Sequence, residues 1–117
     1  MFDTHAHYNN QRFESETPSG TLMLLKELSD KGVTGILNAS WDIESSLDSV
    51  ALAKRLPFVW ASAGIHPSDA KHSPPLNAAM DALSKILDNK EKNKVVAIGE
   101  IGLDYYYAAR ALSAQKK

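Results

Sequence analysis

The chain opens with Phe2-Asp3-Thr4-His5-Ala6-His7, a run typical of a short β-strand that ends in two histidines. Side chains alternate between the two faces of a strand, so Asp3, His5 and His7 are expected to project to one side. Two imidazoles two residues apart can each give a ring nitrogen to one cation, with a nearby carboxylate steadying the site. The alternative is a chance pairing, because His-X-His alone is a short motif.

The rest of the chain alternates strand-like and helix-like segments. Strands are predicted at 2–7, 33–39, 58–64 and 95–98, and residues 8–16 are predicted to form a loop. Helices are predicted at 18–31, from Asp42 to near Leu56, and after Ser73-Pro74, since these stretches carry cap residues and apolar residues at helical spacing. Strands that alternate with amphipathic helices favour a parallel sheet with right-handed crossovers. The helix faces expected to be buried are Leu22, Leu25 and Leu28; Ile43, Leu47, Val50 and Ala51; and Ala79, Met80, Leu83, Ile86 and Leu87.

Polar residues follow each predicted strand. His5 and His7 end the first strand, residues 38–42 end the second, His66 follows the third, and Glu100 and Asp104 follow the fourth. Active sites of parallel α/β folds form at the carboxyl ends of the strands. We therefore expect these side chains to converge at one edge of the sheet.

Composition narrows the chemistry that this edge can support. The 117 residues suit one domain, and 44% hydrophobic content is ordinary for a globular protein. A net charge of −1 gives no overall electrostatic attraction for nucleic acid or membranes, although a local patch can still bind phosphate. The chain has no cysteine, so a metal would be held by histidine and carboxylate. Without a long apolar run or a signal pattern, we expect a cytoplasmic protein with no membrane partner.

Four segments together resemble the TatD family of metal-dependent deoxyribonucleases. They are Phe2-Asp3-Thr4-His5-Ala6-His7-Tyr8, residues 39–46 (ASWDIESS), Gly64-Ile65-His66-Pro67 and the specific octet at 99–106 (GEIGLDYY). The resemblance implies a (β/α)8 barrel, which typically needs about 250 residues. We therefore expect an α/β fold of parallel (β/α) units, about half of such a barrel. Residues 1–117 would be a single N-terminal half-barrel segment, with a fourth outer helix at about 109–117.

The resemblance also implies roles for individual residues. His5 and His7 would bind one divalent cation, and Glu100 would bridge it to a second; Mg²⁺, Mn²⁺ and Zn²⁺ are the candidates. His66 would touch a phosphate or orient the ligand, and Asp104 would support the metal ligands. The alternatives are that His66 closes the turn before Pro67 and that Asp104 caps the next helix. Asn9 stands where relatives often carry aspartate.

These roles predict a metal-dependent hydrolase that cleaves phosphodiester bonds in DNA. Later histidines and an aspartate of the family have no counterparts here, so we expect the chain alone to be weak or inactive. One alternative is a non-catalytic remnant or interaction module that requires a partner chain. Another is an amidohydrolase-like enzyme acting on a small molecule, which the octet at 99–106 disfavours. Open sheet edges and an uncovered apolar face predict self-association or pairing with a complementary half-barrel.

Overall fold

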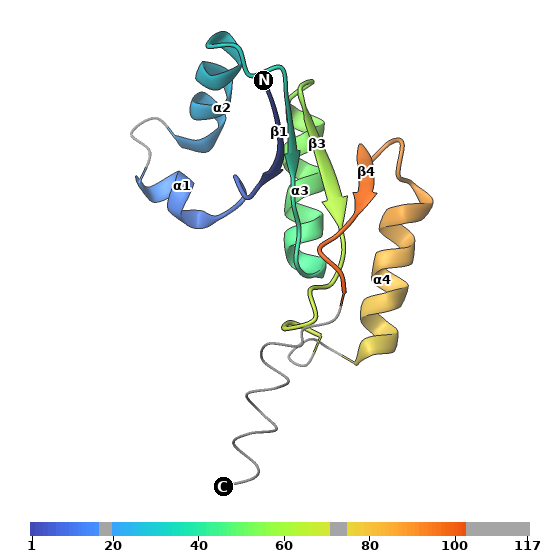
Figure 1. Ribbon diagram of the computed structural model, residues 1–117. Coiled ribbons are helices and arrows are strands. Elements are labelled where there is room, and N and C mark those ends of the chain that lie inside the picture. The colour runs from blue at the N-terminus through green and yellow to red at the C-terminus, as the bar shows by residue number, and fades with distance from the viewer. Residues whose placement is uncertain (17–19, 71–74, 103–117) are drawn as a thin grey trace, which may run out of the picture.

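The computed structural model describes residues 1–16, 20–70 and 75–102, and within them the predicted alternation of strands and helices is present (Figure 1). The predicted fourth outer helix, Asp104, the predicted start of the first helix at residue 18 and the helix start at Ser73-Pro74 lie outside the described residues. The elements are β1 (Phe2–Ala6), α1 (Gln11–Glu16), α2 (Gly20–Asp30), β2 (Gly35–Asn38), α3 (Ile43–Arg55), β3 (Val59–Ala63), α4 (Leu76–Asp88) and β4 (Val95–Ile98).

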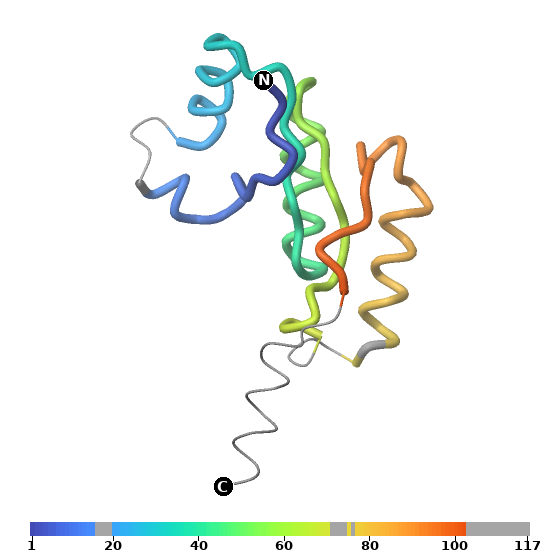
Figure 2. The backbone as a smooth tube through the Cα atoms, viewed as in Figure 1, coloured from blue at the N-terminus to red at the C-terminus, as the bar shows by residue number. Residues whose placement is uncertain are grey.

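The four strands form one parallel sheet in the order β1-β2-β3-β4. Ile36 lies opposite Val59, and Ser62 lies opposite Ala97. After each strand the chain returns through helical structure to the same end of the sheet before the next strand begins (Figure 2). All four carboxyl ends therefore point the same way, as the sequence pattern predicts.

Helix α3 begins where the sequence predicts and buries Val50 as predicted, but the rest of its buried side differs. The Asp42 side chain accepts a hydrogen bond from the Ser45 backbone N–H at 2.7 Å, and the Ser45 hydroxyl reaches back to the Asp42 backbone. Leu47 and Ala51 were expected to be buried, and that prediction is wrong, because both are exposed. Helix α3 packs on β3, and its Ser49 hydroxyl hydrogen-bonds to Asn38 of β2. Its buried side therefore carries three serines beside two apolar residues, namely Ser45, Ser46, Ser49, Val50 and Ala53.

Two further expectations about helices are corrected. Residues 8–16 do not form only a loop, because α1 occupies Gln11–Glu16. The Asn10 side chain caps this helix by accepting from the Arg12 N–H at 3.0 Å. This cap stabilises a helix whose apolar pattern is too short to predict it. Met80 on α4 is exposed, whereas Ala79, Leu83 and Ile86 are buried as predicted.

The core lies between the sheet and the helices and includes Leu25, Ile36, Val59 and Ala61. Phe2 stacks on Trp60 with ring centroids 5.7 Å apart, but half of the Phe2 side chain is exposed. The edge strand β4 exposes Val96 at 62% and Ile98 at 58%. An apolar edge is thus left open, as expected for part of a barrel. None of the described helices combines the length and apolarity needed for a bilayer span.

Candidate metal centre

Three predicted ligands, His5, His7 and Glu100, meet at the carboxyl ends of β1 and β4. The His5 Nε2 atom lies 3.1 Å from the His7 Nε2 atom and 3.3 Å from the Glu100 Oε1 atom. One ligand atom from each residue falls within 4.8 Å of the others. The sheet thus brings together residues that are more than ninety positions apart in the chain.

The hydrogen bond of His7 determines which ring nitrogen can bind a cation. Its Nδ1 atom lies 3.0 Å from the Ala39 carbonyl oxygen. A carbonyl only accepts, so Nδ1 carries the proton and the neutral ring presents a lone pair at Nε2. This carbonyl–histidine arrangement is common behind metal-binding histidines. It leaves Nε2 of His7 directed at His5.

The donor set fits a divalent cation. The His7 Nε2 lone pair and the Glu100 carboxylate both approach His5 Nε2, so the space among them favours positive charge. Two nitrogens bound tetrahedrally at ~2.0–2.1 Å from one zinc ion would lie about 3.3–3.4 Å apart, close to the 3.1 Å between the two Nε2 atoms. Two imidazoles with one carboxylate are also a ligand set used by catalytic zinc. These residues therefore have the chemistry and spacing of a metal centre.

Three consecutive carbonyls after β2 hold the three predicted parts of the site. The Ala39 carbonyl accepts from the His7 ring, and the Ser40 carbonyl accepts from the Glu100 backbone N–H. The Trp41 carbonyl accepts from the His66 backbone N–H at 2.6 Å. The exit of β2 is therefore the common support of segments that leave β1, β3 and β4.

A buried polar network lies behind this support. Asn38 is fully buried; its Oδ1 accepts from the Tyr8 N–H at 2.7 Å, and its Nδ2 lies 2.7 Å from the Ser49 hydroxyl. The Ser49 hydroxyl is 2.8 Å from that of Ser40, whose backbone N–H donates to the Ser62 hydroxyl. The Ser62 hydroxyl in turn donates to the Gly99 carbonyl at 3.0 Å. Since buried polar groups are costly unless paired, the network fixes the segments next to His7 and Glu100.

His66 does not join the three converging ligands within the described part of the chain. Its Nδ1 accepts from the Ser68 N–H at 3.1 Å and lies 2.7 Å from the Ser68 hydroxyl. Its carbonyl accepts from the Asp69 and Ala70 N–H groups, so His66 begins the turn at 67–70 and does not close one before Pro67. Because Nδ1 accepts, the neutral ring carries its proton on Nε2, a donor suited to a phosphate oxygen and not to a metal.

Asp3 and Tyr8 border the centre. The Asp3 Oδ1 accepts from the His5 backbone N–H at 3.1 Å, so this carboxylate supports the strand that carries His5. Burial, with a smaller contribution from the Asp3 charge, raises the pKa of the Tyr8 phenol. Tyr8 therefore stays a neutral phenol at the pH at which imidazoles bind metals.

Sequence reasoning missed the residues that support the ligands. Ala39, Ser40 and Trp41 act through backbone carbonyls, which leave no signature of residue type. The serines had a weak signal, because Ser46, Ser49 and Ala53 are small residues at helical spacing on α3. That spacing is the face of α3 that packs against the sheet.

Parallel β/α units with a histidine pair after the first strand and a carboxylate after the fourth define the class of protein. It is a partial TIM-type barrel with a candidate metal centre at the carboxyl ends of its strands. The family model described as TatD related DNase matches residues 2–117. The chain belongs to this family.

Individual relatives agree with this assignment. The protein is 34% identical over 118 residues to a Pantoea vagans protein named 3′-5′ ssDNA/RNA exonuclease TatD, covering 100% of this chain and 41% of the relative. It is 27% identical over 117 residues to YabD of Bacillus subtilis, an uncharacterised metal-dependent hydrolase, covering 100% of this chain and 42% of the relative. The crystal structure of YjjV, a TatD homologue from Escherichia coli, matches 99% of this chain and 42% of its own with a TM-score of 0.76 and 26% identity. The chain spans about two fifths of the length of these relatives.

Proposed function

We propose that the protein is a metal-dependent hydrolase of the TatD type whose substrate is a phosphodiester bond in DNA. The observation that carries this proposal is the convergence of His5, His7 and Glu100 within 4.8 Å at the carboxyl end of the sheet. Family membership supports the reaction class, and the relatives named as exonucleases of single-stranded DNA and RNA support a nucleic-acid substrate. The GEIGLDYY octet favours this reading over a hydrolase of small molecules.

In this proposal His5 and His7 would hold one divalent cation, and Glu100 would supply carboxylate oxygens to it and to a second. The two imidazoles favour Zn²⁺, while the carboxylate also suits Mg²⁺ or Mn²⁺. Bound divalent metal would supply a hydroxide at neutral pH and neutralise charge on the phosphodiester. The Ala39 and Ser40 carbonyls keep His7 and Glu100 in place, and the Nε2–H of His66 donates to a phosphate oxygen. Asp104 is proposed to support the ligands.

We further propose that residues 1–117 act as one half-barrel unit with weak or no activity alone. Three ligands can hold one ion, but a second ion would need ligands from elsewhere. The exposed Val96 and Ile98 on β4 favour closure of the open sheet by a second copy or a complementary half-barrel. A non-catalytic module that requires a partner chain is the second candidate, favoured by the same exposed edge. The cytoplasmic location expected from the sequence stays a prediction.

Metal titration of the purified chain tests the proposal. Isothermal titration calorimetry with Zn²⁺ and with Mn²⁺ would compare the wild type with His5→Ala, His7→Ala and Glu100→Gln. We expect each variant to lose at least ten-fold in metal affinity, in line with the ~10–100-fold cost of disturbing even the groups behind metal ligands. His66→Ala is the matched control, because His66 does not join the three converging ligands and its removal should leave the metal affinity unchanged. Unchanged affinity in both His5→Ala and His7→Ala would refute the centre.

A cleavage assay separates the two functional candidates. Single-stranded DNA would be incubated with the chain and with Mn²⁺, and products would be followed by gel electrophoresis. Weak cleavage that disappears in His7→Ala supports a hydrolase with an incomplete site. Metal binding without any cleavage supports the non-catalytic module, whereas full-strength cleavage would overturn the expectation that the chain is weak alone.

A further inference from the structure

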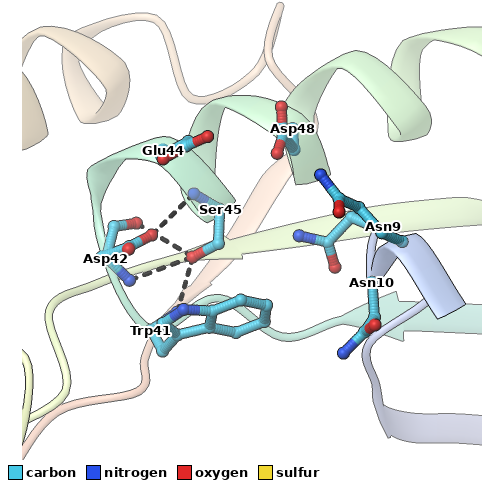
Figure 3. Close-up of a pocket in the computed structure, with 8 residues that line it drawn as sticks. Asn9, Asn10, Trp41, Asp42, Glu44, Ser45 and Asp48 are labelled. Carbon is cyan, nitrogen blue, oxygen red and sulfur yellow. Dashed lines mark hydrogen bonds between the residues drawn. The ribbon is translucent and has the colours of Figure 1, made fainter.

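A polar pocket of about 300 Å³ lies beside the proposed metal centre, between the segment after β1 and the start of α3 (Figure 3). This volume is at the lower end of the ~300–1,000 Å³ that small-molecule sites occupy. In Figure 3 the indole ring of Trp41 extends from the start of α3 toward Asn9 and Asn10. The residues that line the pocket are Asn9, Asn10, Gln11, Trp41, Asp42, Glu44, Ser45 and Asp48.

The backbone N–H, the carbonyl and the indole ring of Trp41 each contact a neighbouring residue. Its N–H donates to the Ser45 hydroxyl at 2.9 Å, and its carbonyl accepts from the His66 N–H at 2.6 Å. Its ring meets the His7 ring at 5.4 Å between centroids and 68° between planes. The indole, which is only partly buried, is therefore a rigid aromatic surface in contact with a proposed metal ligand.

The carboxylates around the pocket repel the phosphate of a nucleotide but not its base. Asp42, Glu44 and Asp48 place carboxylates on its lining, and these repel a phosphate group. A neutral base is not repelled, and its exocyclic amino groups can donate to carboxylates. The phosphate of a bound strand would then lie toward His5, His7 and Glu100, away from the pocket.

The asparagine amides add hydrogen-bonding groups of defined orientation. The Asn10 side-chain oxygen accepts from the Arg12 N–H, and the Asn9 side-chain oxygen accepts from the Asn38 amide at 2.9 Å. With their oxygens so engaged, both side chains present their NH2 groups as donors. Donors together with carboxylate acceptors match the edges of nucleobases, which carry both kinds of group.

We propose that this pocket binds an unpaired nucleobase, stacked on Trp41, in the same strand whose phosphate is held at the His5–His7–Glu100 centre. The inference rests on the proposed function and adds to it the place where a base of the bound strand is held. A base inside a duplex is already stacked and cannot present a face to Trp41. Stacking on one aromatic side chain is worth roughly 5- to 150-fold in affinity per base.

Nucleotide binding in the presence of Zn²⁺ tests the inference. The chain has two tryptophans, so Trp60→Phe leaves Trp41 as the sole tryptophan reporter. Three probes would be titrated: deoxyadenosine 5′-monophosphate, deoxyadenosine, and 2-deoxyribose 5-phosphate, which lacks the base. We expect both base-containing probes to quench Trp41 fluorescence, and the nucleotide to bind at least five-fold more tightly than the sugar phosphate.

Variants of Trp41 separate the pocket from the metal centre. In Trp41→Ala, calorimetry at saturating Zn²⁺ should show the nucleotide and the sugar phosphate binding equally. Trp41→Phe, which keeps an aromatic face, should retain part of the difference and guards against a folding defect. Equal affinities for the two phosphates in the wild type, or a difference that survives in Trp41→Ala, would overturn the inference. Zn²⁺-independent binding of the sugar phosphate would instead refute the metal centre. The deoxyadenosine titration would still test whether the pocket binds a base, because this probe carries no phosphate.

Discussion

Replacing Gly64 by alanine would push directly on the backbone that carries Glu100. Gly64 follows β3, and a Cβ at this position would lie 2.5 Å from the Gly99 carbonyl carbon and 2.6 Å from its oxygen. Ordinary van der Waals contact begins at 3.4 Å, so the two segments would have to separate by about 0.9 Å, the difference between 3.4 and 2.5 Å. The opposing atoms are backbone, which cannot swing away as a flexible side chain can.

This displacement has two expected consequences. Overpacking of a buried position typically lowers the free energy of unfolding by about 1–3 kcal/mol. The Glu100 oxygen, now 3.3 Å from His5 Nε2, would also move by a large fraction of an ångström. Metal affinity should then fall by about 10- to 100-fold, the usual cost of disturbing the groups that orient metal ligands.

Calorimetric titration with Zn²⁺ and urea unfolding followed by circular dichroism would measure the two effects. Gly99→Ala is the matched control, because a Cβ at Gly99 meets nothing within 4 Å although the residue also adjoins Glu100. The control should keep its metal affinity. If Gly64→Ala binds Zn²⁺ as the wild type does, the reasoning that the Gly64–Gly99 contact positions Glu100 is refuted.

Three further perturbations follow from particular contacts. Asn38→Ala should lower the free energy of unfolding by about 1–3 kcal/mol in urea, because it leaves the partly buried Tyr8 N–H without its acceptor. Asn77→Ala, on the exposed side of α4, should change this free energy little. Glu14 accepts a hydrogen bond from the Thr21 N–H, and this bond lowers the pKa of Glu14. The stability that the bond adds is therefore present at neutral pH and is lost as the pH falls below about 4.3 through the lower pKa of the folded state. The difference in unfolding free energy between wild type and Glu14→Gln should shrink over that range, and a constant difference would contradict the link. The double variant Val96→Lys/Ile98→Lys should weaken self-association measured by sedimentation velocity, because both side chains are exposed on the edge strand β4. Leu47→Lys, at an exposed position of α3, is the control and should leave association unchanged. A wild type that stays monomeric at high concentration would argue against association through β4.

The local pattern of the sequence was enough to predict the elements and their direction. Apolar runs, helical spacing and the Asp42 cap predict strands and helices in alternation, and alternation implies parallel strands whose carboxyl ends share an edge. From that rule alone His5, His7 and Glu100 could be expected at one place, and they meet there. The rule works because strand direction is a property of connectivity, which the order of residues contains.

Other predictions failed or were missing because they depend on what packs against each residue. Leu47 was expected to be buried, yet α3 turns a serine-rich side to the sheet, where the Ser49 hydroxyl accepts from the Asn38 side chain of β2. Residues 11–16 lack a long apolar pattern, and α1 forms with the help of the Asn10 cap.

The support of the centre was decided by tertiary structure alone. The carbonyls of Ala39, Ser40 and Trp41 hold the His7 ring and the backbones of Glu100 and His66, and every residue type has a carbonyl. Only the pairing of β2 with its neighbours determines which of these oxygens faces which donor. The sequence thus identifies the proposed metal-binding side chains through their chemistry, but their orientation arises from backbone groups that carry no sequence signal.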